Sequence, residues 1–176
     1  FRRVLFRSGL PARHLVRPPV SAGDDGLLLR QVRLMAELQE GYNREIAEDW
    51  RVAGLPFYRA VWVECAEMLD HFGWKWWKKQ TADAEQVRLE LVDVWHFGLS
   101  DLLRQGVEPE TVARALAAAA AGGDGGPSAG REPEAARRAI ETLAARTRAS
   151  GAFDPDAFVA VRAALAVEPR ALYEAH

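Results

Sequence analysis

Two pairs of carboxylates inside strongly apolar stretches constrain this chain more than any other feature. Glu64 and Glu67 form the first pair, Glu90 and Asp93 form the second pair, and 22 residues lie between the two pairs. On a helix, acids three residues apart project from one face, with Cβ atoms roughly 5–6 Å apart. Burying unpaired carboxylates is costly unless a cation compensates them. The pattern therefore predicts two packed helices that share a cation.

A divalent metal is the expected cation, because Lys and Arg are scarce in both stretches. Two antiparallel helices joined by a turn near Gly73 would bring the four acids together. All-oxygen ligation suits Mg²⁺ or Mn²⁺, and Mg²⁺ commonly binds substrate phosphates as well. The predicted chemistry is phosphoryl or nucleotidyl hydrolysis. Spacing alone is weak evidence, since Glu37/Glu40 and Glu45/Glu48 share it; we expect those four acids to lie on a solvated helix face.

Helical periodicity predicts an all-α fold, a compact helical bundle with the acid-bearing antiparallel helices at its centre. The expected helices cover residues 27–50, 57–72, 84–104, 108–121, 131–148, 156–166 and 170–175. Thr81 or Asp83 is expected to cap the third helix, and no strand is expected.

The chain has 176 residues, of which 49% are hydrophobic, so a single domain over residues 27–176 is expected. Residues 1–26 carry five arginines and three prolines; we expect a disordered or non-native leader there. The glycine-rich segment 122–130 predicts a flexible loop.

Composition argues against several classes of partner. A net charge of −2 gives no electrostatic basis for binding a nucleic-acid polymer. No apolar run approaches the ~20 residues of a membrane span. The single cysteine, Cys65, allows no disulfide within one chain, which fits a cytoplasmic location. Cys65 is either a buried small hydrophobic residue, the interpretation we favour, or a nucleophile.

Side chains at three further places are candidate substrate contacts. Gln39 and Asn43 interrupt the apolar stripe of the first helix, where neighbouring backbone or a ligand could satisfy their amides. Three tryptophans then alternate with lysines over residues 74–79, either as a packing wedge or as a stacking ring with phosphate-binding ammonium groups. His96 follows Asp93 by three residues and shares its face, as a substrate contact or a packed histidine.

The region from residue 34 to residue 103 resembles the all-α dimeric dUTPase family. The resemblance rests on the E-x-x-E pair, the string GWKWWK from Gly73, and the string ELVDVWHF from Glu90. This family belongs to the all-α nucleoside triphosphate pyrophosphohydrolases, whose signature is E-x-x-E followed by E-x-x-D. Family members continue with a further C-terminal substrate-binding segment, so we expect the domain to be truncated at its C-terminus.

The resemblance implies roles for individual residues. The metal ligands for Mg²⁺, or Mn²⁺, would be Glu64, Glu67, Glu90 and Asp93. Glu64 is also our choice for the catalytic proton acceptor. The substrate-binding residues would be Gln39, Asn43 and Trp76 at the base, and Lys78 at the phosphates.

The expected function is Mg²⁺-dependent hydrolysis of dUTP, and of dUDP, to dUMP with release of pyrophosphate or phosphate. The expected partners are the nucleotide substrate and a second copy of the chain. A homodimer is expected because Trp62, Phe72, Trp95 and Phe97 offer more apolar surface than one small bundle can cover, and because the family is dimeric. Two alternatives stay open: a related pyrophosphohydrolase for another nucleoside triphosphate, and a non-catalytic helical dimerisation module.

Overall fold

A computed structural model of the chain describes residues 24–122 and 133–175. The leader expected at residues 1–26 lies outside the described residues as far as residue 23. The flexible loop expected at 122–130 also lies outside them from residue 123 onward.

The described residues form an all-α fold, as the sequence predicts. The helices are α2 (Asp24–Ile46), α3 (Phe57–Phe72), α4 (Ala84–Arg104), α5 (Pro109–Gly122), α6 (Pro133–Ser150), α7 (Pro155–Ala164) and α8 (Pro169–Ala175). No strand occurs within residues 24–122 or 133–175. None of these helices combines the length and the apolar character that crossing a membrane requires.

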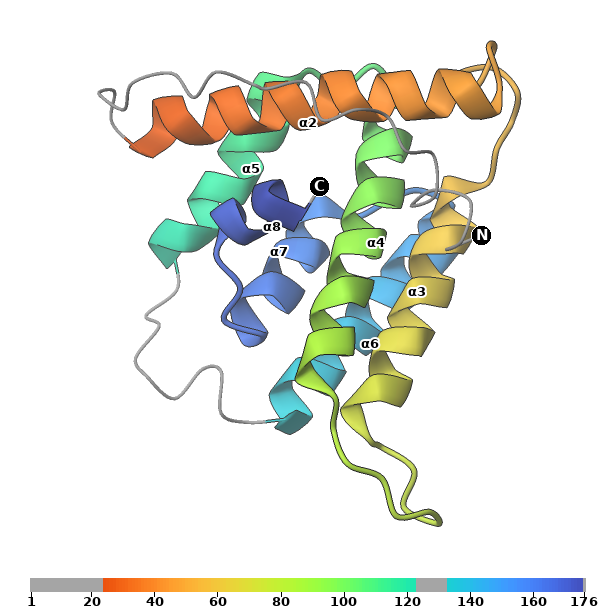
Figure 1. Cartoon of the computed structure of the whole chain (residues 1–176), viewed down its shortest axis with the longest axis vertical. Helices are drawn as coiled ribbons and strands as arrows, with labels where there is room; N and C mark the ends of the chain where they lie inside the picture. Colours follow the sequence, from red (N-terminus) through yellow and green to blue (C-terminus); the bar gives the residue numbers. More distant parts are fainter. Residues whose placement is uncertain (1–23, 123–132, 176) are drawn as a thin grey trace.

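The acid-bearing helices α3 and α4 form the centre of the bundle. Figure 1 shows them as an antiparallel pair joined by a loop at one end, with α2 crossing their opposite end. Helix α3 packs most extensively on α4 and also along α6, while α2 packs on α5 and on α4. This arrangement confirms the predicted antiparallel pair.

Local signals set the limits of α3 and α4 as expected. Gly73 ends α3 in the left-handed conformation, with φ of 74°. A residue with a side chain would be strained in this backbone conformation. Asp83, rather than Thr81, caps α4, because its side chain accepts hydrogen bonds from the N–H groups of Glu85 and Gln86.

Helix α2 ends earlier than predicted, at Ile46 instead of residue 50. The chain turns after α2 so that Trp50 can enter the core, where its side chain is almost fully buried. The Trp50 ring meets Phe57 edge to face at 5.9 Å, and its indole N–H donates to Glu40 over 3.3 Å. Tertiary packing of one large ring therefore overrides the helical pattern of the sequence.

Glu40 corrects the expectation of a solvated acidic face on α2. Its half-buried carboxylate accepts hydrogen bonds from Arg44 at 2.9 Å, Arg51 at 2.6 Å and Trp50. Burial raises the pKa of Glu40, but the hydrogen bonds from Arg51, Arg44 and Trp50 outweigh it and lower the pKa below its ordinary value. Glu40 thus ties α2 to the connection that follows it, while Glu37 is exposed.

The core also corrects part of the reasoning for a dimer. Trp95 is buried within its own chain, where it stacks on Phe158 of α7 with centroids 5.4 Å apart. Its indole N–H points to the sulfur of Met35 on α2, 3.3 Å away. Phe72 packs against the core under the guanidinium of Arg137. Trp95 therefore needs no second subunit to cover it, and Phe72 is partly covered within its own chain.

The connection between α6 and α7 packs tightly on α4. A Cβ atom on Gly98 would lie 2.6 Å from the ring of Phe153, so only glycine leaves room for this ring. One turn further, the fully buried Asp101 accepts the backbone N–H of Phe153 at 2.8 Å. The same carboxylate accepts hydrogen bonds from Arg104 and Gln105. This contact fixes the orientation of α4 in the bundle.

Candidate metal centre and nucleotide site

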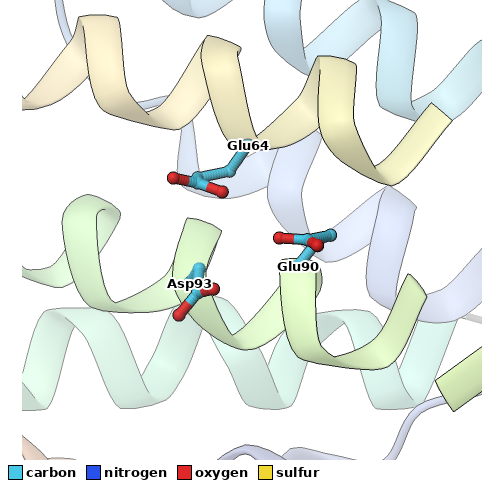
Figure 2. A group of neighbouring side chains, drawn as sticks. All are labelled: Glu64, Glu90 and Asp93. Atoms are coloured by element: carbon cyan, nitrogen blue, oxygen red, sulfur yellow. The ribbon is translucent and has the colours of Figure 1, made fainter. Parts of the chain in front are cut away.

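Three of the four predicted metal ligands lie together between α3 and α4. Oxygen atoms of Glu64, Glu90 and Asp93 all lie within 4.8 Å of one another. Figure 2 shows Glu64 extending from α3 towards the two acids of α4. Glu90 is fully buried, and Glu64 and Asp93 are half-buried. The described residues therefore hold a compact, all-oxygen cluster.

Helical spacing explains how the cluster forms on an apolar scaffold. On α3, Val61, Cys65 and Met68 are fully buried and attach the helix to the core. Glu64 precedes Cys65 and is turned from that buried stripe towards α4. On α4, Glu90 and Asp93 are one turn apart and share one face. The antiparallel packing of the two helices brings the two acid-bearing faces together.

Glu67, the fourth predicted ligand, lies outside this group of three. Its side chain is exposed on α3, one turn beyond Glu64. It still lies close enough for its negative charge to raise the pKa of Glu64. Glu67 stays a predicted ligand at the solvent side of the cluster.

The charge of the cluster fits a divalent cation. Burial, and then the charges of Glu67, Asp93 and Glu90, raise the pKa of Glu64 to about 8. Acids that disfavour one another's ionisation in this way would all be stabilised by a cation between them. The donor set consists of carboxylate oxygens, which Mg²⁺ and Mn²⁺ prefer. The residues present therefore fit such an ion, with Glu64, Glu90 and Asp93 as its holders.

The structure adds a neighbour that the sequence analysis missed. Nε2 of His71, in the last turn of α3, lies 3.1 Å from Oε1 of Glu90. His71 follows Glu64 by seven residues, which is two helical turns, so both project from one face. That spacing is the signal that could have identified His71.

Two other residues that the sequence analysis singled out, a candidate substrate contact and a candidate nucleophile, lie near the cluster in sequence. His96 is half-buried on α4, and its backbone carbonyl accepts a hydrogen bond from Ser100 at 2.9 Å. Cys65 is fully buried, and burial followed by the charge of Glu64 raises the pKa of its thiol to about 12. A thiol with this pKa is protonated at neutral pH, so the buried hydrophobic role of Cys65 is favoured over a nucleophilic one.

The two predicted base-binding amides form a buried hydrogen-bond network with α4. Gln39 donates from Nε2 to Oδ1 of Asn43 over 3.2 Å. Asn43 donates from Nδ2 to the hydroxyl of Ser100 over 3.0 Å, which the sequence analysis did not foresee. Oε1 of Gln39 is buried and has no hydrogen-bond partner within the described ranges. Asn43 is thus held by the protein, while Gln39 keeps one acceptor available.

The predicted contacts Trp76 and Lys78 lie far from these amides within one chain. They belong to the loop between α3 and α4, at the end opposite α2 in Figure 1. Ser100, which contacts Asn43, lies 16 residues after the start of α4, a distance of about 24 Å along a helix. Trp76 is 88% exposed and meets Trp77 edge to face at 5.5 Å. One chain does not bring the ring and the amides to one base.

Comparison with known protein families shows which family the chain belongs to. Residues 31–126, more than half of the chain, match the sequence profile of a family described as dUTPase. The chain belongs to the dUTPase family. Comparison with curated proteins gave no significant match.

Membership of the dUTPase family agrees with the all-α fold and identifies the protein as an enzyme, a dUTP diphosphatase. The matched region begins within α2, includes all of α3, α4 and α5, and contains every candidate site residue. dUTPases of this family generally depend on a divalent metal, and the acid cluster offers a place for one. The resemblance noted from the sequence is thereby confirmed.

Proposed function

We propose that the protein hydrolyses dUTP, and dUDP, to dUMP with Mg²⁺ held by Glu64, Glu67, Glu90 and Asp93, and that Mn²⁺ can replace Mg²⁺. The observation that carries this proposal is the cluster of Glu64, Glu90 and Asp93, with oxygens within 4.8 Å, in a chain of the dUTPase family. When bound, the metal would supply positive charge that neutralises the charge developing on the phosphates, and it would lower the pKa of a water molecule.

Glu64 is the proposed proton acceptor. Its carboxylate extends from α3 towards Glu90 and Asp93, so it would lie beside a water molecule bound at the cluster and could accept its proton. In the proposed reaction with dUTP, water adds its oxygen to phosphorus and gives its proton to Glu64. The phosphoanhydride bond between the α- and β-phosphates breaks, and pyrophosphate leaves from dUMP.

Gln39 is the proposed reader of the uracil edge. Uracil offers two carbonyl acceptors and one N–H donor, and the buried Oε1 of Gln39 could accept that N–H. Asn43, held by Ser100, would then fix the orientation of the Gln39 amide. Cytosine lacks the N3 proton, so it would leave Oε1 without a donor. One unsatisfied buried polar group costs about 1–3 kcal/mol, which corresponds to roughly tenfold to hundredfold discrimination.

Steady-state turnover of a panel of nucleotides with Mg²⁺ tests this function. We expect kcat/KM for dUTP to exceed that for dCTP at least about tenfold, and we expect dUDP to be hydrolysed. Gln39→Ala should narrow the ratio, while Gln31→Ala, two turns earlier on the same helix, serves as the control. Equal turnover of dUTP and dCTP would reject uracil selection but leave a pyrophosphohydrolase. Absence of turnover for every nucleotide would favour the non-catalytic dimerisation module.

A further inference from the structure

Glu90 is the most deeply buried acid of the cluster. Its side chain is completely shielded from solvent, whereas Glu64 and Asp93 retain some exposure. A buried carboxylate is costly unless hydrogen bonds or opposite charges replace the lost water. Glu64 and Asp93 face Glu90 within the cluster, and when a cation holds all three acids as carboxylates, none of them can donate to another. A hydrogen-bond donor from outside the cluster would then stabilise the Glu90 carboxylate.

His71 meets this requirement. Its Nε2 atom lies 3.1 Å from Oε1 of Glu90, within hydrogen-bond distance. An ionised carboxylate accepts hydrogen bonds, and an imidazole N–H is a donor of the kind that suits this contact. The donor on α3 thus reaches across to the acid on α4.

The backbone around His71 holds its ring in place. The carbonyl of His71 accepts the N–H of Asp83 at 2.9 Å, which ties the end of α3 to the start of α4. Gly73 then ends α3 two residues later in the left-handed conformation. The end of α3 and the start of α4 therefore fix the backbone from which the imidazole projects.

We propose that His71 is a positioning residue of the metal centre, which holds Oε1 of Glu90 so that the carboxylate keeps its orientation towards Glu64 and Asp93. Among the described residues, His71 is not a member of the group whose ligand atoms lie within 4.8 Å of one another. It acts through Glu90, not as a ligand. This inference rests on the proposed metal site.

Orientation of this kind has a measurable effect on metal binding. A carboxylate free to rotate loses entropy when it binds an ion, and a hydrogen bond that fixes it beforehand removes part of that cost. Loss of such a hydrogen-bond partner typically weakens metal binding about 10–100-fold. The hydrogen bond from His71 to Glu90 should have an effect in this range.

Two variants at position 71 separate the hydrogen bond from simple packing. His71→Gln keeps an N–H donor at the same number of bonds from Cα, and His71→Leu fills similar space without a donor. Mn²⁺ binding is measured by titration calorimetry on the nucleotide-free proteins. We expect His71→Gln to bind within about threefold of wild type and His71→Leu to bind about 10–100-fold more weakly. kcat for dUTP at limiting Mn²⁺ should follow the same order.

If His71→Leu binds Mn²⁺ as tightly as wild type, the inference is wrong. A lower melting temperature of this variant would then show only that His71 contributes to the stability of the fold. Equal weakening in His71→Gln and His71→Leu would also overturn the inference, since the ring itself would then be required. His71→Asn, whose amide is one bond too short to reach Oε1, replaces His71→Leu if the latter does not fold. Absence of Mn²⁺ binding by the wild-type protein would instead reject the proposed metal centre and the inference with it.

Discussion

Glu64 combines a half-buried position with three acidic neighbours, so its ionisation opposes folding when no cation is present. The pKa of its carboxyl group is about 8 in the folded chain, above the ordinary value of 4.5. The folded state therefore binds more protons than the unfolded state between these two pH values. Stability of the metal-free protein should fall as the pH rises from about 4.5 to about 8.

Glu64→Gln should remove this pH dependence. We expect its metal-free form to melt about 2–5 °C above wild type at pH 9, with the difference vanishing near pH 4.5. Excess Mn²⁺ should raise the melting temperature of wild type but not that of the variant. Scanning calorimetry at the two pH values measures both effects, and Glu141→Gln, an exposed acid on α6, is the control. A variant that melts like wild type at pH 9 would contradict this account of Glu64.

Gly98 allows a test of packing at a single atom. A methyl group at this position would lie 2.6 Å from the ring of Phe153, which is itself buried and packed against Phe158. Gly98→Ala should therefore lower the free energy of unfolding by about 1–3 kcal/mol through overpacking. Gly41→Ala is the matched control, because nothing lies within 4 Å of its added Cβ; it should stabilise α2 by about 0.5–1 kcal/mol. Urea denaturation measures the free energy of unfolding of both variants. Equal changes in Gly98→Ala and Gly41→Ala would argue against the close contact between Gly98 and Phe153.

At the scale of elements, Asp101 connects α4 to the α6–α7 connection. Its buried carboxylate accepts the backbone N–H of Phe153 and hydrogen bonds from Arg104 and Gln105. Asp101→Ala would leave the N–H of Phe153 unsatisfied in the core. We expect a loss of about 2–4 kcal/mol in the free energy of unfolding. Urea denaturation tests this, with the exposed Glu45→Gln of α2 as control; similar effects of the two changes would contradict the role of Asp101.

At the scale of the whole molecule, the remaining exposed apolar side chains are the feature that bears on assembly. Several large ones stay exposed, namely Leu38, Ile46, Val52, Trp74, Trp76, Trp77 and Leu89. We propose a homodimer in which the α3–α4 loop of one subunit approaches the amides of the other. This arrangement would bring Trp76 and Gln39 to one nucleotide, which a single chain does not do. Sedimentation equilibrium should give twice the 19.5 kDa of one chain, and a monomer at micromolar concentration would contradict the proposal.

Mixing two variants tests whether the site is shared between subunits. Gln39→Ala and Trp76→Ala should each impair dUTP turnover when assayed alone. In a mixture refolded together, half of the dimers are mixed, and each mixed dimer has one site without either change. The mixture should therefore regain up to about a quarter of wild-type activity. A mixture no more active than its separate components would show that each chain builds its own site.

Local chemistry in the sequence determined much of the fold and of the candidate site. The limits of α3 and α4 follow from residues adjacent to them, Gly73 and Asp83, whose preferred backbone and capping roles depend little on the remaining chain. The shared face of Glu90 and Asp93 follows from helical spacing alone. For the same reason, the sequence led directly to the carboxylate cluster between two antiparallel helices.

Tertiary structure alone decided how each polar side chain is used. Spacing cannot distinguish the buried Glu90 from the exposed Glu67, because burial depends on how α3 packs against α4 and α6. Ser100 beside Asn43 is separated from it by 57 residues, and Phe153 lies against Gly98 from a different helix connection. Such contacts form only when distant elements pack, so no local pattern of residues encodes them.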